Sequence, residues 1–359
     1  LGWRSIFLIN LPVGLLALIL GTITIQDTNK KSAGKIDLLG LLFSTSMIFS
    51  TVFALIQKET HSDYAWTDWR IMTLFAVAVL SLLFFILVEG KVKEPMIDLK
   101  MFHSSSFVGA NIAAFTLGAG LYGGFTYLSI LLQSYMGYSA FETGLKLLVI
   151  SVFTLVLGPI TGLISGKIGN RWLISIALLI GMAGVLVINQ MIKVPFKWDY
   201  LMPGFILLGI SNALVNPPIS NAAMSAVNEE QVGMASGILN VFRQVGISFG
   251  VVMLGISVTN GYNSNLNQSL AKLTMVPTAI KEQLTALLHK AGPFAGRQLF
   301  ENTQAKAYSQ LPIFDQVKEM VFTAYNHGMK NANFLIAILL LIGAISSLVL
   351  IRDKQVKSV

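Results

Sequence analysis

Uncharged polar and aromatic side chains recur at helical spacing within strongly apolar stretches of this sequence, and such side chains can bind a small molecule. In one stretch they step by three or four residues, which places them on one face of a helix. Polar groups facing lipid are costly, whereas a cavity can use them to bind a ligand. We therefore expect one helix to line a cavity with Asn111, Phe115, Tyr122, Phe125 and Gln133.

Such a surface would suit lipophilic cations, which gain about 0.5–2 kcal/mol from each cation–π contact. The competing interpretation is that aromatic rings at this spacing only pack between helices, and for Phe115 and Phe125 alone we favour it. Glycines are interleaved with this face and would give the helix the conformational freedom of a rocking element. They are Gly118, Gly120, Gly123 and Gly124.

A second apolar stretch carries amides on a single stripe. Asn212, Asn216 and Ser220 are four residues apart, and Asn221 follows. Unpaired amides in hydrocarbon are expensive, and hydrogen bonds between membrane helices contribute only about 0.6 kcal/mol on average. Stability alone hardly accounts for so many asparagines. We expect these residues to line a water-filled path or substrate site, and the alternative is hydrogen bonding between helices.

A third segment places small residues four apart and ends in a basic turn. Small residues at this spacing let two helix backbones approach closely, and a proline within the segment would loosen the helix without breaking it. The segment is either a close-packed helix with a cytoplasmic anchor or a latch on an inward gate, and a further arginine near a predicted cytoplasmic helix start has the same two interpretations. These candidates are Gly158, Pro159, Gly162, Gly166, Lys167, Gly169, Arg171 and Arg243.

Titratable residues are scarce inside the apolar stretches. None has an acidic residue at depth, where proton coupling usually places one. The best candidate in this sequence is Glu142, which lies near the start of a stretch beside Lys146. The four histidines fall between stretches without metal-ligand spacing, so we expect neither a metal nor a cofactor.

The elements that must position these residues are transmembrane helices. Hydrophobic residues make up 54% of the chain and charged residues 12%, against roughly 45–50% and 25% in soluble domains. A transmembrane helix needs about 20 mostly apolar residues, so we expect an all-α polytopic membrane protein. The predicted spans are Phe7–Ile25, Leu38–Gln57, Ile71–Val88, Phe107–Leu132, Thr143–Ser165, Leu173–Met191, Leu201–Asn221, Met234–Ser257 and Asn333–Ile351.

The distribution of charge predicts the orientation of these spans. The net charge of +8 comes from Lys and Arg scattered among short loops, which argues against nucleic-acid binding. They are more frequent in alternate loops and in the C-terminal tail, so those loops and the C-terminus should be cytoplasmic. The connection 259–332 is long and polar, and we expect it to carry a pair of amphipathic helices outside the cell, with a flexible tether as the alternative.

Two strings resemble one family of transporters. W-R-x-I-F-x-I-N-x-P-x-G from Trp3 resembles the start of the sixth span of the fourteen-span drug:proton antiporters of the major facilitator superfamily, the EmrB/QacA type. G-M-A-S-G-I-L-N-V-F-R-Q-V-G from Gly233 is similar to their thirteenth span. The segment around Gly166–Arg171 resembles the superfamily's G-x-x-x-D-R-x-G-x-R loop, with Asn170 where an acid is expected. The resemblance implies a fragment that lacks about five N-terminal spans and, with them, the coupling carboxylates.

The resemblance also implies a division of the chain. Residues 1–26 would be the last helix of the N-terminal half, and 27–106 a linker with a two-helix insertion. Residues 107–258 would be five helices of the C-terminal half, with the external loop at 259–332 and the last helix and tail at 333–359.

The implied function is that of a secondary active transporter and not of an enzyme. It would be a monomer in the bacterial cell membrane that exports lipophilic or cationic drugs in exchange for protons, powered by the proton-motive force without a cofactor. Besides lipid, its partners would be drug molecules and protons. The alternative is a narrow carrier for a single antibiotic class, an amino acid or another metabolite. A membrane enzyme would need clustered titratable residues, and an ATP-driven pump a G-x-x-x-x-G-K-[ST] loop; the sequence has neither.

Overall fold

A computed structural model describes residues 4–24, 37–61, 64–92, 95–273, 278–301 and 312–353. The chain forms two compact units, Leu1–Asp37 and Leu38–Val359. Every regular element in the described ranges is a helix. The all-α class predicted from composition is therefore confirmed.

The first unit contains one short and one longer helix, α1 (Arg4–Leu8) and α2 (Asn10–Thr24). The sequence predicts one span over Phe7–Ile25, but α2 has 15 residues, fewer than the roughly 20 that cross a bilayer. The last predicted residue, Ile25, lies outside the described ranges. A ninth span therefore stays a prediction.

The second unit holds eight helices that are long and apolar enough to cross a membrane, within the described part of the chain. Each overlaps one of the eight remaining predicted spans. They cover Leu38–Thr60, Trp69–Glu89, Ser105–Tyr135, Ala140–Ser165, Asn170–Met191, Trp198–Ser225, Glu229–Ala271 and Ile313–Leu350.

The span that carries the predicted cavity face is not a uniform α-helix. It consists of α5 (Ser105–Leu117), the π-helical turn η2 (Gly118–Tyr122), α6 (Gly123–Ile130) and a second π-helical turn, η3 (Leu131–Tyr135). A π turn adds a residue to a helical turn and rotates everything that follows, and such turns often occur at functional sites. The 3.6-residue spacing assumed from sequence is therefore broken at Gly118.

Glycines let this span pack tightly against α10 (Val232–Ala271). A Cβ at Gly123 would lie 3.1 Å from the backbone of Gly250, and one at Gly250 would lie 2.5 Å from the Cα of Ala119. Gly246 likewise meets the backbone of Phe115. Small residues thus bring two membrane helices into backbone contact, a packing role beyond the flexibility predicted for this glycine-rich segment.

Three further helices, α7 (Ala140–Ile168), α8 (Asn170–Met191) and α9 (Trp198–Ser225), form a layer beside α5. The helix α8 packs against both α9 and the last helix, α14 (Pro312–Leu350), while α7 packs on α9. Three prolines lie inside α9, which neighbouring helices make tolerable by satisfying the freed carbonyls. The Asn212 stripe therefore lies on a helix with close neighbours.

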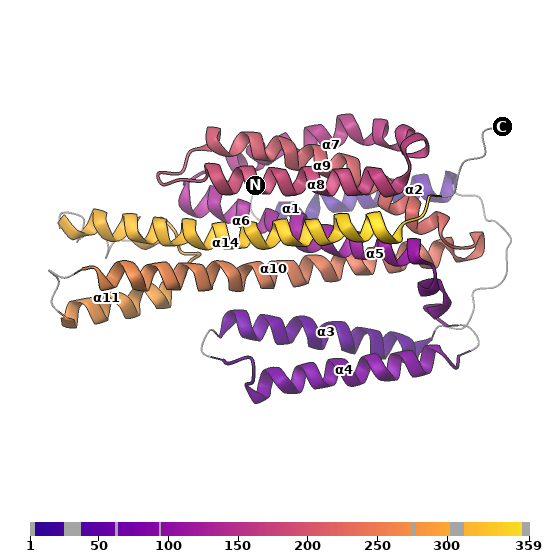
Figure 1. Cartoon of the computed structure of the whole chain (residues 1–359), viewed down its shortest axis with the longest axis horizontal. Helices are drawn as coiled ribbons and strands as arrows, with labels where there is room; N and C mark the ends of the chain where they lie inside the picture. The colour runs from indigo at the N-terminus through magenta and orange to yellow at the C-terminus, as the bar shows by residue number, and fades with distance from the viewer. Residues whose placement is uncertain are drawn as a thin grey trace. The chain divides into compact units, whose positions relative to one another are not determined.

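The long connection is more helical than predicted. Figure 1 shows α10 and α14 side by side, both continuing past the ends of α7, α8 and α9. The helix α11 (Thr278–Ala291) agrees with the first predicted amphipathic helix, and α12 (Gln298–Glu301) follows it. The second predicted amphipathic segment is not a separate helix, because α14 starts at Pro312 and no proline interrupts it.

The segment after α11 docks onto the end of η3. The backbone N–H of Arg297 donates to the Ser134 carbonyl at 2.7 Å, and its guanidinium Nη1 donates to the Met136 carbonyl at 3.0 Å. The Tyr135 hydroxyl donates to the Pro293 carbonyl at 2.5 Å. Residues 293–297 are therefore bound to the end of the cavity helix, which a flexible tether would not be.

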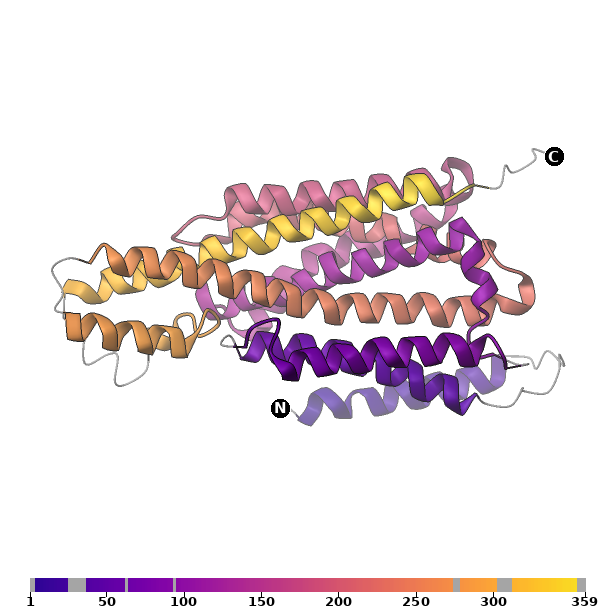
Figure 2. The same cartoon turned by 60° about the horizontal axis from the view of Figure 1, so that its bottom comes forward.

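The helices α3 (Leu38–Thr60) and α4 (Trp69–Glu89) pack as an antiparallel pair. The Ser81 hydroxyl donates to that of Ser46 at 3.0 Å between them. Figure 2 shows α3 running along α10, with which it is in contact. The short helix η1 (Leu99–His103) then leads into α5.

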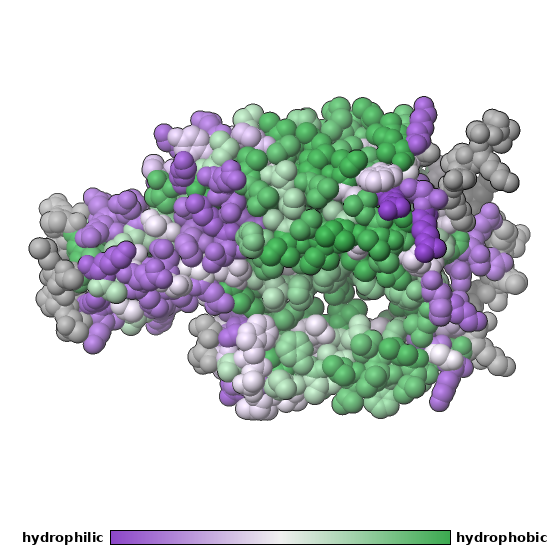
Figure 3. Space-filling view, viewed as in Figure 1, coloured by the Kyte–Doolittle hydropathy of each residue, from purple (hydrophilic) through white to green (hydrophobic). Residues whose placement is uncertain are grey.

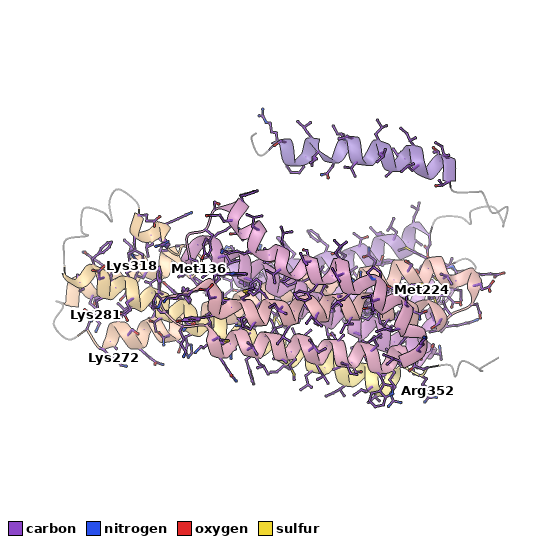
Figure 4. All side chains as sticks on the ribbon, turned by 90° about the horizontal axis from the view of Figure 1, so that it is seen from above. Met136, Met224, Lys272, Lys281, Lys318 and Arg352 are labelled. Carbon is purple, nitrogen blue, oxygen red and sulfur yellow. The ribbon has the colours of Figure 1, made fainter. Side chains whose placement is uncertain are left out.

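The second unit is apolar in its middle and hydrophilic at its two ends. Figure 3 shows a broad apolar surface over the middle of the helices, with hydrophilic side chains at both ends. Figure 4 places Lys272, Lys281 and Lys318 at the end formed by α10, α11 and α14, and Met224 and Arg352 at the opposite end. The connection between α10 and α14 and the segment after α14 therefore lie at opposite ends of the bundle.

Candidate functional site

A hydrogen-bonded cluster of Tyr122, Asn212 and Asn216 joins the cavity helix to α9. All three side chains are half-buried. The Tyr122 hydroxyl lies 3.0 Å from Asn212 Oδ1 and 3.3 Å from Asn216 Oδ1, and Asn216 Nδ2 donates to that hydroxyl at 3.0 Å. Two stretches predicted separately from sequence are thus brought together at one place.

In this cluster, the Asn216 Nδ2 group has several acceptors, whereas the Asn216 Oδ1 atom can accept a further hydrogen bond. Asn216 Nδ2 also donates to the Asn212 backbone carbonyl at 2.9 Å and to Asn212 Oδ1 at 3.1 Å. Tyr122 has one hydroxyl hydrogen, which cannot serve both amide oxygens at once. When it bonds Asn212, the Oδ1 of Asn216 has lone pairs free for another donor. The cluster can therefore accept a hydrogen bond from an N–H or O–H group of a ligand.

Sequence analysis missed a fourth member of the cluster, Thr154 on α7. Its hydroxyl accepts a hydrogen bond from Asn212 Nδ2 at 2.9 Å and donates to the Ile150 carbonyl at 3.1 Å. A threonine that bonds its own helix is common inside membrane helices, so the sequence carried no signal for its contact with Asn212. Thr154 fixes the orientation of the Asn212 amide.

Phe125 lies next to this cluster and beside a small internal cavity. Its ring is 6.0 Å from that of Tyr122 in an edge-to-face arrangement. The cavity has a volume of about 10 Å³ and is lined mainly by apolar side chains of α6, α8, α9 and α14. One polar residue, Asn333 of α14, also lines it. This volume is close to the minimum that holds one water molecule, and it is far smaller than a ligand pocket.

The other residues predicted for the cavity face lie elsewhere. Asn111 is 1% exposed and donates to the carbonyl of Phe107 in its own helix at 2.8 Å. The half-buried Phe115 packs against Phe249 of α10 with 5.5 Å between ring centroids, while Gln133 is exposed. The two π turns rotate successive segments of this span, so the predicted single face is divided among several neighbours.

The predicted basic turn is held by an acid that sequence analysis did not select. Gly169 has φ +90° and ends α7. The Asp353 carboxylate accepts hydrogen bonds from the N–H groups of Asn170 at 2.8 Å and Arg171 at 3.3 Å, at the start of α8. A carboxylate stabilises a helix N-terminus by satisfying free N–H groups and opposing the helix dipole. Asp353 therefore joins the segment after α14 to the turn before α8.

Asn221 belongs to this same end of the bundle and not to the Tyr122 cluster. It is exposed and donates to Asn170 Oδ1 at 3.2 Å. Ser106 adds a further contact, since its hydroxyl accepts from the Arg352 N–H at 2.9 Å. Segments from α5, α8, α9 and the chain after α14 thus meet here, an arrangement that a gate would require.

We expect Asp353→Asn to weaken this junction. An amide loses the charge that favours the α8 N-terminus, and the loss of such a cap costs about 0.5–2 kcal/mol. Deuterium uptake of the Asn170 and Arg171 amides should therefore rise in the variant. Asp315→Asn, at an exposed site at the other end of the bundle, is the matched control and should leave it unchanged. Equal uptake in wild type and Asp353→Asn would contradict the capping role.

The small-residue face of α7 has open space around it. A Cβ at Gly158 or Gly162 would meet no atom within 4 Å. Lys167 is exposed, Pro159 lies within the helix, and the surroundings of Gly166 fall outside the description. The close-packed helix pair predicted from this spacing is not present around Gly158 and Gly162 in the described residues. The face has room for another helix.

Arg243 of α10 is half-buried next to the close crossing with α5. Its Nε is buried and has no hydrogen-bond partner among the described residues, and its backbone carbonyl contacts Gly118. An anchor that reaches the membrane surface would expose its guanidinium. Only Nε is buried in this way and the residue as a whole is half-buried, so the anchor and the gate both stay predictions.

The structure gives Glu142 a local role. Its carboxylate accepts hydrogen bonds from the Ser139 N–H at 2.8 Å and hydroxyl at 2.9 Å, while Ser139 Oγ accepts from the Glu142 N–H. This capping box starts α7. Lys146, one turn further on, lies 4.2 Å from the ring centroid of Tyr138 and 4.8 Å from that of Trp198. Glu142 therefore interacts with its own helix start.

A family model supplies the decisive comparison. The model described as Major Facilitator Superfamily matches residues 1–251, which is more than half of the chain. The chain belongs to the major facilitator superfamily. Members of this superfamily are multi-pass membrane transporters, which agrees with the helical bundle described above. The coarse part of the predicted family assignment is thereby confirmed.

Several curated members of the superfamily are similar to this chain. Multidrug transporter protein MdtP of Bacillus subtilis is 29% identical over 267 residues, which cover 74% of this chain and 48% of that protein. Multidrug resistance protein Stp of Mycobacterium tuberculosis is 29% identical over 296 residues, covering 82% and 54%. The tetracenomycin C resistance and export protein of Streptomyces glaucescens is 28% identical over 261 residues, covering 71% and 47%.

The matches cover only part of the curated relatives and of a similar solved structure. The chain spans about half the length of the curated relatives it matches. Among solved structures, a bacterial homologue of the human lysosomal transporter Spinster aligns with 85% of this chain and 67% of its own at 14% identity, with a TM-score of 0.48.

Proposed function

We propose that this chain forms the second half, with its connector helices, of a fourteen-span drug:proton antiporter of the EmrB/QacA type in a bacterial cell membrane. Support comes from relatives whose matched segments make up only 48% and 54% of their own length and which are named for multidrug transport and multidrug resistance. Residues 1–26 would close the N-terminal half, 27–106 would be the two-helix insertion, and 107–258 with 333–359 the six-helix C-terminal half. The count of nine spans is part of this proposal.

The open face of α7 supports the same assignment. Gly158 and Gly162 are free of neighbours within 4 Å, although small residues at this spacing favour close helix packing in membranes. A helix from the N-terminal half would fill this space. Alternating access would then move one half against the other around a central site, with the whole transporter acting as a monomer and the C-terminus in the cytoplasm.

The cluster of Tyr122, Asn212 and Asn216 carries the substrate proposal. It offers an aromatic ring and a free amide oxygen, and its hydrogen bonds within the described residues involve no charged side chain. An aromatic face attracts cations, by about 0.5–2 kcal/mol depending on desolvation, while Asn216 Oδ1 would accept from an ammonium or amine hydrogen. Lipophilic amines and cations are therefore the substrate class that this surface fits best.

A second candidate is a narrow exporter of a single antibiotic class. One relative is named for resistance to and export of tetracenomycin C. The orientation of Asn212 by Thr154 at 2.9 Å favours this candidate, because fixed hydrogen bonds discriminate among ligands more strongly than apolar surfaces do.

Efflux from cells tests the antiport proposal. We expect the whole transporter, expressed in an efflux-deficient bacterium, to lower ethidium accumulation, and a protonophore to abolish the effect. A strain with the empty vector is the control. Resistance to one antibiotic with no effect on ethidium would favour the narrow exporter. No effect on any of a panel of dyes and antibiotics would refute drug export.

A further inference from the structure

Glu59 meets Tyr127 at the contact between α3, α6 and α10. The sequence-based span ended at Gln57, but α3 continues to Thr60 and includes this half-buried glutamate. The Glu59 carboxyl group is hydrogen-bonded to the Tyr127 hydroxyl. The same hydroxyl donates to the backbone carbonyl of Val251 in α10. A single phenol thus connects the end of α3 to two helices of the bundle.

Gly255 of α10 creates the room for this contact. A Cβ at this position would meet Glu59 Oε1 and would lie 2.5 Å from the Tyr127 hydroxyl oxygen. The carboxyl group therefore sits directly on the α10 backbone. No larger residue could occupy position 255 without displacing it.

When Glu59 is ionised, its contact with Tyr127 and Val251 has two acceptors for a single hydroxyl hydrogen. The Val251 carbonyl can only accept a hydrogen bond, and an ionised carboxylate can only accept. The Tyr127 hydroxyl has one hydrogen and cannot donate it fully to both. Both contacts are satisfied together only if Glu59 carries a proton and donates to the Tyr127 oxygen. A protonated Glu59 would therefore satisfy every polar group of this cluster.

The charges around Glu59 do not supply a counter-ion. Within the described residues, no cation lies within ion-pairing distance of its carboxylate. Lys58 of α3 donates to the Tyr64 carbonyl at 2.5 Å, and Arg70 of α4 binds the Tyr64 hydroxyl. His61 stacks on the Tyr64 ring with 4.5 Å between centroids. These cationic and titratable groups of α3 and α4 all interact with the connecting loop.

The segments of α6 and α10 that lie beside Glu59 are also free of charged side chains. Tyr127 is the one titratable residue of α6, and α10 has none between Val251 and Asn260. Tyr127 in turn interacts electrostatically with Tyr325 of α14. An ionised carboxylate here would be partly desolvated without a counter-ion, which is costly.

We propose that Glu59 is a proton-binding site whose protonation holds α3 against α6 and α10. On binding, a proton from the aqueous phase at the end of α3 forms an O–H bond with a carboxylate oxygen. That O–H donates to the Tyr127 oxygen, and the phenolic hydrogen stays on the Val251 carbonyl. On release, the O–H bond breaks and the proton passes to water in the aqueous phase. Two acceptors then compete for one hydrogen, and the carboxylate moves toward water.

The use of this site in transport rests on the proposed antiport function. There, Glu59 would be a coupling residue on a connector helix, outside the two six-helix halves. The binding of the proton does not rest on that function. The two statements are tested by separate measurements below.

Infrared spectroscopy tests the site itself. Protonated carboxyl groups have a carbonyl band distinct from that of carboxylates, so we expect acidification of the full chain in lipid vesicles to produce a band that is lost in Glu59→Gln. Tyr127→Phe should shift its frequency by removing the hydrogen bond. Glu282→Gln, at an exposed site on α11, removes a different band that Tyr127→Phe leaves in place. A Glu59 band that does not change in Tyr127→Phe would overturn the proposal.

A fluorescent label tests the movement of α3. The chain has no cysteine, so Thr60→Cys, at the exposed last residue of α3, gives a single labelling site. We expect the label's emission to titrate with pH in this background and to stay constant when Glu59→Gln is added, because glutamine keeps a donor and cannot ionise. Gly255→Ala should give the released emission at all pH values. The same titration with and without Glu59→Gln would refute the proposal.

Transport by the whole protein then tests the coupling role. We expect Glu59→Gln to reduce drug-driven proton flux about tenfold, within the usual range of coupling between two sites. Normal flux in Glu59→Gln with an intact infrared result would refute the coupling role alone. Absence of any drug transport in wild type would refute the proposed function, and the proton site would still stand on the spectra.

Discussion

Replacing Gly250 with leucine should prevent the chain from folding. A Cβ at this position lies 2.5 Å from the Cα of Ala119 and also meets the Ala119 carbonyl, so it collides with backbone and not with a side chain that can rotate. The span α5–η3 would have to separate from α10 over several turns. Overpacking a core costs about 1–3 kcal/mol and more when the surroundings cannot move, and we expect the upper end here.

The loss of folded protein can be measured as a fall in thermal stability in detergent, or as aggregation on size-exclusion chromatography. Gly162→Leu is the matched control, because it makes the same change on another transmembrane helix where a Cβ meets nothing within 4 Å. It should remain monodisperse with an unchanged melting temperature. Equal stability of the two variants would show that α10 does not cross Ala119 as closely as described.

Replacing Tyr122 or Asn216 with alanine should change which compounds the whole transporter exports and leave its expression intact. Tyr122→Ala removes both the aromatic face and the hydroxyl that Asn212 and Asn216 share. The loss of a cation–π contact and a hydrogen bond amounts to about 1–2 kcal/mol for a cationic ligand. Resistance to cationic dyes should therefore fall about tenfold, since 1.4 kcal/mol corresponds to a factor of ten.

Two further substitutions separate the contribution of the Tyr122 ring from that of the hydrogen-bonding groups. Tyr122→Phe keeps the ring and should affect only ligands that need the hydroxyl or amide groups, while Asn216→Ala removes the free acceptor and should weaken amines more than quaternary cations. Gln190→Ala, an exposed residue of α8, is the control. An unchanged resistance profile in Tyr122→Ala and Asn216→Ala would indicate that the cluster only joins helices.

The sequence alone was sufficient for properties that depend on local composition. Continuous apolar runs predicted eight helices that the structure contains, because a helix satisfies its own backbone in lipid and needs no distant partner to be recognised. The connection 259–332, expected to carry amphipathic helices, contains the helix α11. The opening and Gly233–Gly246 strings pointed to the major facilitator superfamily, which the family match confirms.

Helix ends were less predictable than helix centres. The spans expected to end at Gln57 and Ser257 continue to Thr60 and Ala271. Polar residues led us to end these helices at the expected membrane boundary, but packing between α10 and α14 continues outside it. Glu59 was overlooked for this reason, since it lies in the additional turn of α3.

The tertiary structure alone decided which side chains meet. The face expected from Asn111 to Gln133 assumed 3.6 residues per turn, and the π turns at Gly118–Tyr122 and Leu131–Tyr135 rotate it apart. Asp353 reaches the turn at Asn170 from 183 residues away in sequence. Contacts between distant segments depend on helix crossing and rotation, which no local pattern encodes. The sequence therefore determined the membrane helices and the family, and the packing decided the Tyr122 cluster, the Asp353 cap and the Glu59–Tyr127 contact.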